Sequence, residues 1–557
     1  MPSMGDLLSS VGRGVMAFAG FGGSAYSAGR YDMPETGGWH ARPIHAESNW
    51  SNGNDAIVGR ADDSDRNQAW INGGLDRDVE ATIGTGLRPW PTPIYAAFGK
   101  DFAWAAAWGE NLLASYRAWA EDPLKRCDAQ MLMTLGELER LAYLNFRRTG
   151  ECLFEIRKDE RGGTNPTNIM LIDPKRIDNP MGKGDSDPNF KNGIEYQNNV
   201  PVAAWIRPFH PDDKRSDKGM NEPIRVPFRT TTGTQKLVLI SNKRFIEQVR
   251  GVSPLAGSLT VSKNLDSFEK DVANRAKLET QMGAFITSES TPEEVAEIVA
   301  PGSTPSEGNT LAAIMDWRNK SPLKAIQGLF FRHLVGKEKV TFMPPVTPGN
   351  NYNEFRKSNI AKLSTPMGWM ASEVSQDYEG INLSNARAMD NRRFRTVLQN
   401  REIWARNWNV AIYIAWMEEE VAAGRIKIPG GPAKFYANLS AVTNATWIGP
   451  GRGTIDPMKE GNGRNLEEAA NRASPIDHIL QNNQYPSEVW DQKAYAMAEM
   501  KRRKLPMPDY NTKGAGTDGT DGGDAGSGNP ADGDQDGIPN EADKKKSKPA
   551  SKGGQGQ

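Results

Sequence analysis

Apolar residues recur at helical spacing in the first third of the chain, after a polar beginning. Four of them stand at every fourth position: Ile71, Leu75, Val79 and Ile83. This spacing predicts a helix that begins near Asp62 and stops at Gly84. A leucine-rich pattern predicts another helix over about 127–149, with Gly150 as its C-terminal cap. Residues 1–60 show no sustained period, and we expect an extended arm there.

Short strand-like runs replace the helical pattern after Gly150. They are CLFEIR, NIMLI, GIEY, PVAAWI and KLVLI, and each is bounded by proline, glycine or asparagine. Short apolar runs separated by turn-forming residues are typical of strands. Together with the preceding helices, they predict an α+β domain over residues 61–250.

Two long helices are predicted on either side of a segment with short strands. The first covers about 255–281, with an apolar stripe and evenly mixed charges on its other faces. Residues 284–342 contain strand-like runs and loops. The second helix covers about 353–364 and breaks at Pro366, because proline lacks an N–H and its ring opposes the preceding helical turn.

An aromatic, arginine-rich helix follows a polar irregular segment at 368–383. Its aromatic stripe is formed by Trp404, Trp408, Ile412 and Trp416. Arginines gather in its first half: Arg387, Arg392, Arg393, Arg395, Arg401 and Arg406. Aromatic residues at helical spacing are usually buried against neighbouring elements, so we interpret the stripe as core packing. A ligand-binding face is the alternative.

Four sequence blocks carry a resemblance to a known family. SQDYEGINLSNARA (375–388), followed by the arginine-rich helix, is similar to the signature of lambda-type portal proteins of tailed phages. GRADDSDRNQAWINGGLDRDVEATIGTGLR (59–88), RGVSPL (250–255) and WIGPGRGTIDPMKE (447–460) resemble three further blocks of that family, in the expected order. Leu383 departs from the pattern, because the family usually has tyrosine at that position.

The resemblance implies an α+β portal fold with wing, stem, clip and helical crown, assembled as a ring around a central channel. The implied parts are a flexible N-terminal arm (1–60), an α+β wing (61–250), a stem helix (251–283), a clip (284–345), a second stem helix (346–366), a tunnel loop (367–384), a long wing or spine helix (385–425), C-terminal wing or crown helices (426–510) and a disordered low-complexity tail (511–557).

The family's function would then be that of a portal. Copies of the chain would form a ring, a dodecamer as in the family, at one capsid vertex, through which double-stranded DNA is packaged and ejected. The implied partners are other copies, major capsid and scaffolding proteins, the terminase large subunit, head–tail adaptor proteins and DNA bound without sequence specificity. The implied location is the virion, after assembly in the host cytoplasm, with no membrane contact.

The resemblance also assigns candidate channel residues. The tunnel-loop candidates are Glu373, Gln376, Asp377, Tyr378 and Asn382. Tyr378, Gln376 and Asn382 would touch DNA transiently, and the acidic residues would repel phosphates. The channel-stem candidates are Lys263, Lys270, Arg356, Lys357 and Lys362. An ordinary acidic surface turn is the alternative interpretation of the loop.

Composition agrees with a conduit better than with a clamp on nucleic acid. The 557 residues exceed what one compact core usually holds, and the net charge is −1. A protein that holds DNA by its phosphates needs an excess of lysine and arginine. The two cysteines, Cys127 and Cys152, lie in apolar patterns and are expected to be buried free thiols, made in a reducing compartment. No apolar run approaches the roughly 20 residues that span a bilayer.

Motifs for catalysis are missing from the sequence, so we expect no enzyme and no required cofactor. There is no G-x-x-x-x-G-K-[ST], no H-E-x-x-H and no G-x-S-x-G, and the five histidines are scattered. A calcium-loop spacing does occur in the tail, at Asp532, Asp534, Asp536 and Asp543. A solvated charged tail is the alternative.

Two other functions remain open from the sequence. A metal-dependent nuclease or hydrolase would use aspartate and glutamate, which are plentiful, and metal-dependent DNA cleavage by the pure protein would reveal it. Another virion structural or connector protein without a DNA channel role is the second, and the stoichiometry of the assembly would distinguish it from a portal.

Overall fold

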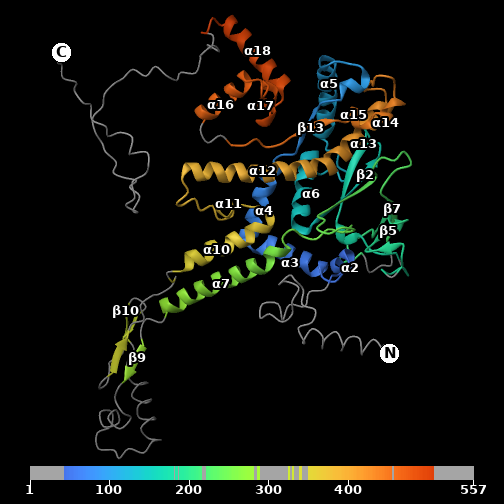
Figure 1. Ribbon diagram of the computed structural model, residues 1–557. Coiled ribbons are helices and arrows are strands. Elements are labelled where there is room, and N and C mark those ends of the chain that lie inside the picture. Colours follow the sequence, from blue (N-terminus) through green and yellow to red (C-terminus); the bar gives the residue numbers. More distant parts are fainter. Residues whose placement is uncertain are drawn as a thin grey trace, which may run out of the picture. The chain divides into compact units, whose positions relative to one another are not determined.

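A computed structural model describes most of the chain (Figure 1). The described parts are residues 43–281 except 181, 186 and 216–220, the strands 285–288, 324–326, 329–331 and 338–341, residue 349, and residues 351–453 and 457–506. The chain divides into two compact units, Met1–Ala494 and Tyr495–Gln557. Everything below lies in the first unit, except the C-terminal part of the last helix.

The N-terminal described region is helical: α2 is Ala46–Ser51, α3 is Asn54–Asn67 and α4 is Ala69–Thr82. The expected extended arm is therefore wrong for residues 46–60, and residues 1–42 lie outside the described residues. The helix expected from Asp62 is also wrong at its start, because Gln68 is extended and separates α3 from α4. Small and polar buried residues form the inner face of α3, so its sequence lacks a clear apolar stripe.

Helix α6 (Leu135–Thr149) begins later than the leucine pattern predicted. Thr134 caps it. The Thr134 side-chain oxygen accepts from the backbone N–H of Glu137, and the Glu137 carboxylate accepts from the backbone N–H of Thr134. The preceding residues form turns, in which Asp128 accepts backbone N–H groups of Gln130, Leu132 and Met133. The predicted end at Gly150 is confirmed, with the left-handed backbone of a C-cap. Upstream lie β1 (Arg88–Pro91), η2 (Tyr95–Phe98) and α5 (Phe102–Ala120).

All five predicted strand runs form strands, in two antiparallel sheets. The three-stranded sheet has the order β3-β2-β8, and the four-stranded sheet has the order β4-β5-β6-β7. Their bounds are β2 Glu151–Lys158, β3 Thr167–Ile172, β4 Phe190–Lys191, β5 Ile194–Gln197, β6 Val200–Ile206, β7 Ile224–Pro227 and β8 Leu237–Ser241, with η3 (Pro174–Arg176) between β3 and β4. In the central register of the smaller sheet, Phe154 lies between Leu171 and Val238.

Two long helices lie side by side, as Figure 1 shows: α7 (Ala256–Gln281) and α10 (Tyr352–Ser364). The pair is antiparallel, because Ser258 Oγ donates to the Leu363 carbonyl at 2.6 Å near one end, while the Phe268 ring lies 4.5 Å from the Phe355 ring near the other. Between them in sequence come β9 (Phe285–Ser288), β10 (Lys324–Ile326), β11 (Leu329–Phe331) and β12 (Glu338–Thr341), with β9 paired to β12.

The aromatic helix consists of α12 (Leu383–Asn407) and α13 (Asn409–Ala422), joined at Trp408. The predicted stripe is confirmed as core, since all four of its residues are at most 1% exposed. The rings of Trp404 and Trp408 stack with centroids 5.5 Å apart, and Tyr413 stacks on Trp416 at 5.9 Å. This core also takes residues from α4, α5, α6 and the sheet β3-β2-β8. Both cysteines are buried free thiols, as predicted.

The remaining elements follow in chain order. They are α14 (Lys434–Ala437), α15 (Leu439–Val442), β13 (Ala445–Ile448), α16 (Pro457–Ala469), α17 (Pro475–Gln481) and α18 (Pro486–Arg502). Strand β13 pairs antiparallel with β1, so the C-terminal part is attached to the N-terminal helices by a two-stranded sheet.

Candidate functional site

The segment 368–382 joins α10 to α12, and its first half is fixed to the core. η5 (Thr365–Met367) ends at Gly368, which has a left-handed backbone. Trp369 then lies against α4: a Cβ atom added at Gly74 would come within 2.5 Å of its ring, so only glycine permits this approach. A short helix, α11 (Ala371–Ser375), follows with Val374 buried. The predicted irregular loop therefore contains a helical turn.

A buried ion-pair network holds this half of the segment. Asp78 on α4 is 0% exposed and accepts from Arg147 Nε at 2.6 Å and from Arg393 Nη2 at 2.9 Å. Arg393 Nε also donates to Glu373 Oε2 at 2.9 Å. Arg147 Nη2 donates to the carbonyl of Met367 at 2.9 Å. The network thus ties α4, α6 and α12 to both sides of Trp369; we call it the Asp78 network.

The charges of this network depend on one another. Burial alone would lower the pKa of Arg393, but Asp78 and Glu373 outweigh it and hold that pKa above its ordinary value. Burial likewise opposes the charge of Arg147, and Asp78 again raises its pKa overall. Removing one partner of such a buried network leaves an uncompensated charge in the interior, which is strongly destabilising.

The second half of the segment is an exposed tip. Gln376 has a left-handed backbone, and with its amide oxygen turned toward α4 it accepts from Arg77 Nη2 at 2.6 Å. Lys357 on α10 reaches over to Asp377 at 3.2 Å and Glu379 at 3.8 Å. The N–H of Glu379 and the ammonium of Lys357 hold the pKa of Asp377 below its ordinary value. Tyr378 is 64% exposed.

Besides Gln376 and Asp377, two more of the five tunnel-loop candidates have partners within the described chain. Glu373 is paired with Arg393, and its expected effect on phosphates stays a prediction. Asn382 is the N-cap of α12, and its side-chain oxygen accepts from the backbone of Asn385 at 2.8 Å. The exposed tip retains Gln376, Asp377 and Tyr378 as candidates.

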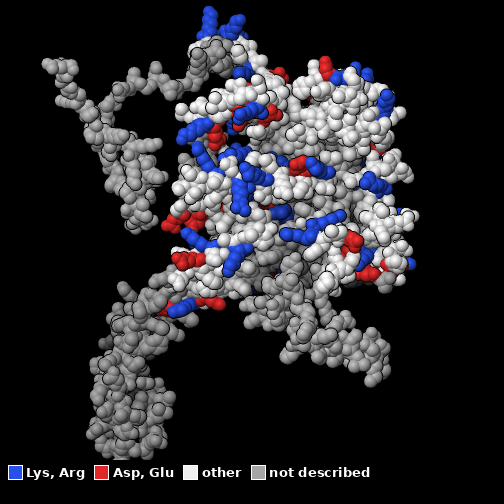
Figure 2. Space-filling model, in the orientation of Figure 1, with Lys and Arg blue, Asp and Glu red and all other residues white. Residues whose placement is uncertain are grey.

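The five stem candidates lie on α7 and α10, but only Lys357 is brought to the loop. Lys263 and Lys362 are exposed on their helices. Lys270 pairs with Asp266 one turn away at 2.8 Å. Arg356 lies over the Tyr352 ring, 5.9 Å from its centroid. Figure 2 shows acidic and basic side chains intermixed on the face in view, rather than one continuous basic stripe.

The arginine cluster of α12 divides into buried and exposed members. Arg401 donates to the carbonyls of Ala81 and Thr82 at the end of α4 and to that of Pro450, each at about 3 Å. Burial lowers the pKa of Arg401 to about 10. Arg392 and Arg395 are exposed. Sequence reasoning placed all of them on one helix but could not separate anchors from surface charges.

The other family-like blocks also join distant elements. Gly86 in the first block faces Gly136 so closely that an added Cβ atom would lie 2.6 Å from the Gly136 Cα. Arg250 in RGVSPL makes a two-pronged pair with buried Glu151, at 2.7 and 2.8 Å. Gly449 in the last block admits the side chain of Arg401. These blocks therefore specify close packing.

The described part of the chain shows neither a metal-ligand cluster nor a membrane-spanning helix. No group of three or more histidine, cysteine, aspartate or glutamate residues is arranged there to hold a metal ion. The calcium-loop residues Asp532, Asp534, Asp536 and Asp543 lie outside the described residues. None of the described helices is both long and apolar enough to cross a bilayer.

The chain order defines a portal-type subunit. Two long antiparallel helices are separated in sequence by a small β segment, and they are followed by a short anchored loop and a long core helix. The chain belongs to the lambda family of phage portal proteins: the profile described as "Phage portal protein, lambda family" matches residues 33–401. The resemblance inferred from the four sequence blocks is thus confirmed.

Two curated relatives are named as portal proteins. The chain is 21% identical over 433 residues to the portal protein of Escherichia phage N15, covering 76% of this chain and 80% of that protein. It is also 21% identical over 407 residues to portal protein B of Escherichia phage lambda, covering 72% and 75%.

Among solved structures, the chain is distantly similar to a chain of the "Neck of empty GTA particle computed with C6 symmetry". The TM-score is 0.43 at 12% identity, with 80% of this chain and 96% of that chain covered. A chain of the "Neck of native GTA particle computed with C12 symmetry" gives 0.35 at 13% identity, with 74% and 99% covered.

Proposed function

We propose that copies of this chain form a ring, a dodecamer, at one vertex of a phage capsid, and that double-stranded DNA passes through its channel during packaging and ejection. Family membership supports this function most directly. The subunit acts structurally, and the assembly rather than the single chain performs the function.

One structural observation carries the mechanistic part of the proposal: the tip at 376–379 is exposed while its base is held by the Asp78 network. A channel that lets DNA slide needs contacts that are numerous, weak and without sequence specificity. An exposed Tyr378 beside Asp377 and Glu379 supplies polar contact without strong phosphate attraction, and Lys357 limits the repulsion. The anchored base keeps the tip at a fixed level.

The partners follow from that role. The ring would contact major capsid and scaffolding proteins, then the terminase large subunit during packaging, and head–tail adaptor proteins afterwards. Assembly would take place in the host cytoplasm, and the mature location would be the portal vertex of the virion. A connector without a DNA channel role is the alternative, and the test below separates the two.

The test is electron microscopy of the purified full chain, with native mass spectrometry to count the copies. The proposal expects closed rings of one stoichiometry, with a bore wide enough for a DNA duplex and α7 and α10 along it. Closed shells, filaments or rings without an open bore would contradict it. If the pure chain stays monomeric, the same measurement with scaffolding and capsid proteins present must yield rings, or the proposal fails.

A further inference from the structure

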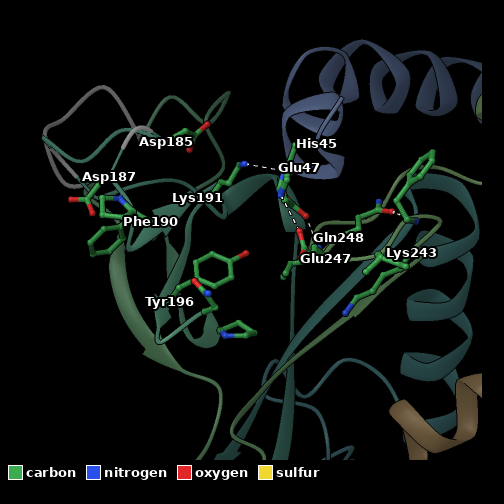
Figure 3. Close-up of a pocket in the computed structure, with 16 residues that line it drawn as sticks. His45, Glu47, Asp185, Asp187, Phe190, Lys191, Tyr196, Lys243, Glu247 and Gln248 are labelled. Atoms are coloured by element: carbon green, nitrogen blue, oxygen red, sulfur yellow. Dashed lines mark hydrogen bonds and ion pairs between the residues drawn. The ribbon is translucent and has the colours of Figure 1, made fainter. Parts of the chain in front are cut away.

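A pocket lies away from the loop 368–382, between α2, the β4–β5 hairpin and the segment 243–249 (Figure 3). Its volume is about 890 Å³, within the range of pockets that hold ligands or peptide side chains. Figure 3 shows Phe190 and Tyr196 on the hairpin side, facing Lys243 and Gln248 across the cavity. The pocket therefore has aromatic walls with charged groups among them.

The rim of this pocket exposes two large apolar residues on a rigid segment. Phe245 is 61% exposed and Ile246 is 92% exposed. The segment is fixed by Gln248, whose buried side chain accepts the backbone N–H groups of Arg244 and Phe245, at 2.8 and 3.1 Å, and donates to the carbonyl of Arg250 at 2.7 Å. Apolar side chains that a fixed backbone holds in water indicate a surface that another segment covers.

The chain itself brings a candidate to this surface. The described structure begins at residue 43, and His45 lines the pocket. His45 also connects the two walls, because its ring lies 3.2 Å from Lys191 Nζ on the hairpin and 3.5 Å from Glu247 on the opposite side. The described chain therefore begins two residues before a residue that lines the pocket.

We propose that this pocket binds the protein's own residues 31–40, with the indole of Trp39 as the anchor. Five residues lie between Trp39 and His45, a span of at most about 20 Å, so Trp39 can reach the cavity. Tryptophan suits a pocket with aromatic walls and a polar rim, because it has a large apolar surface and one N–H donor. Covalent attachment gives the segment a high effective concentration at the pocket.

The charges of the pocket are mixed and do not by themselves select the occupant. The lining has Lys191 and Lys243 but also Glu47, Asp185, Asp187 and Glu247, so Asp32 and Glu35 of the segment have only the two lysines to pair with. Such pairs at the rim would add little affinity, but they favour one direction of the segment over the other. The inference does not depend on the proposed function, since pocket and segment belong to one chain.

A disulfide test decides it in the full chain. The variant His40→Cys/Ile246→Cys places one thiol on the segment, next to the retained Trp39, and one on the rim. The native thiols Cys127 and Cys152 are at most 2% exposed, and burial raises the pKa of both, so they should not interfere. The matched control is His40→Cys/Phe102→Cys, because Phe102 is also well exposed (58%) but lies on α5.

Under mild oxidation, we expect the test variant to lose both engineered thiols and to run as a compact single chain on a non-reducing gel, while the control keeps its thiols. Equal loss of thiols in both variants would overturn the proposal. Covalently linked multimers of the test variant would overturn it as well, because they would assign the pocket to the segment of another copy.

Hydrogen exchange provides a second measurement without cysteine. In the full-length Trp39→Ala variant, the backbone amides of residues 245–247 should exchange several-fold faster than in the unmodified protein, since the covering segment is weakened. Phe21→Ala, which removes an aromatic residue of the N-terminal region outside 31–40, should leave that exchange unchanged. Unchanged exchange in Trp39→Ala would contradict the proposal.

Discussion

Single buried charges determine how the loop 368–382 is held. Asp78 is the centre of the Asp78 network, because two arginines donate to it from α6 and α12. Its neighbour on the helix, Asp76, is exposed. Two aspartates of one helix thus have opposite roles: the first compensates buried positive charge and the second is solvated.

Replacing Asp78 should therefore be severe. Asp78→Ala leaves Arg147 and Arg393 without their shared carboxylate, and breaking a buried ion pair in this way lowers the free energy of unfolding by about 3–5 kcal/mol. Asp76→Ala should change it by less than about 0.5 kcal/mol. Urea unfolding of both variants measures the difference, and equal values for the two would show that the network contributes nothing.

Glu139 gives a pH dependence at the residue scale. It is 1% exposed and accepts from the Leu87 N–H at 2.7 Å and the Trp404 indole at 3.1 Å; burial nevertheless raises its pKa to about 7, from an ordinary value of 4.5. The folded state then binds a proton more tightly than the unfolded state. The contribution of this bound proton to the free energy of unfolding is fully present below about pH 4.5 and is lost as pH rises through about 7.

The variant Glu139→Gln removes this proton linkage. Across pH 4.5 to 7, the free energy of unfolding of the unmodified protein should fall relative to that of Glu139→Gln. Urea unfolding at several pH values in that interval measures the trend. A constant difference between the two proteins would mean that Glu139 does not titrate there.

At the scale of elements, the first half of the loop 368–382 packs against helix α4. Its residue Gly74 faces the Trp369 ring, whereas a side chain added at Gly73 would meet only the flexible end of Arg77. Asp78 lies one turn further along the same helix. The helix therefore positions the loop by a close backbone contact and by charge.

The two adjacent glycines test this contact. Gly74→Ala should push Trp369 out of its place and lower the free energy of unfolding by about 1–3 kcal/mol, as overpacking does. Gly73→Ala should raise the free energy of unfolding by roughly 0.5–1 kcal/mol, because alanine loses less backbone entropy than glycine when a helix forms. Limited proteolysis at 368–382 should be faster in the first variant alone. If both variants were equally stable and protected, the contact would not anchor the loop.

At the scale of the whole molecule, charge balance suits transient contact with DNA. The net charge of −1 gives no general attraction to phosphates, and the acidic tip repeats in every copy of the proposed ring. A substitution that changes the charge of the tip is therefore repeated in every copy around the proposed channel. Electrostatic effects of the loop should be larger in the assembly than in the single subunit.

Reversing the charge of the tip should make the ring hold DNA instead of letting it slide. For assembled Asp377→Lys/Glu379→Lys, we expect tighter binding to double-stranded DNA, a steeper fall of affinity with salt, and slower packaging. Asp212→Lys/Glu222→Lys, which reverses two exposed acids of the α+β region, changes net charge equally and should have a smaller effect. DNA binding at several salt concentrations measures this. Equal salt dependence in both variants would place the tip outside the channel.

Much of the element structure could be predicted from local patterns. The five strands, the two long helices and the buried Trp404–Trp416 stripe follow from the spacing of apolar residues and from turn-forming residues, which act over a few positions. The start of α6 and the presence of α3 were missed. A capping box outweighed the leucine pattern in α6, and α3 buries small and polar residues in place of an apolar stripe.

The sequence by itself determined the family, most elements and the position of the loop, because these depend on neighbouring residues and on recognisable blocks. Only the tertiary structure decided which loop residues are anchors. Glu373 looks like the other acidic residues of the loop in the sequence, yet it pairs with Arg393, whereas Asn382 caps α12 through a local bond to the backbone of Asn385. Arg393 in turn meets Asp78 across 315 residues, and a contact of that separation is made by packing, which no local pattern encodes.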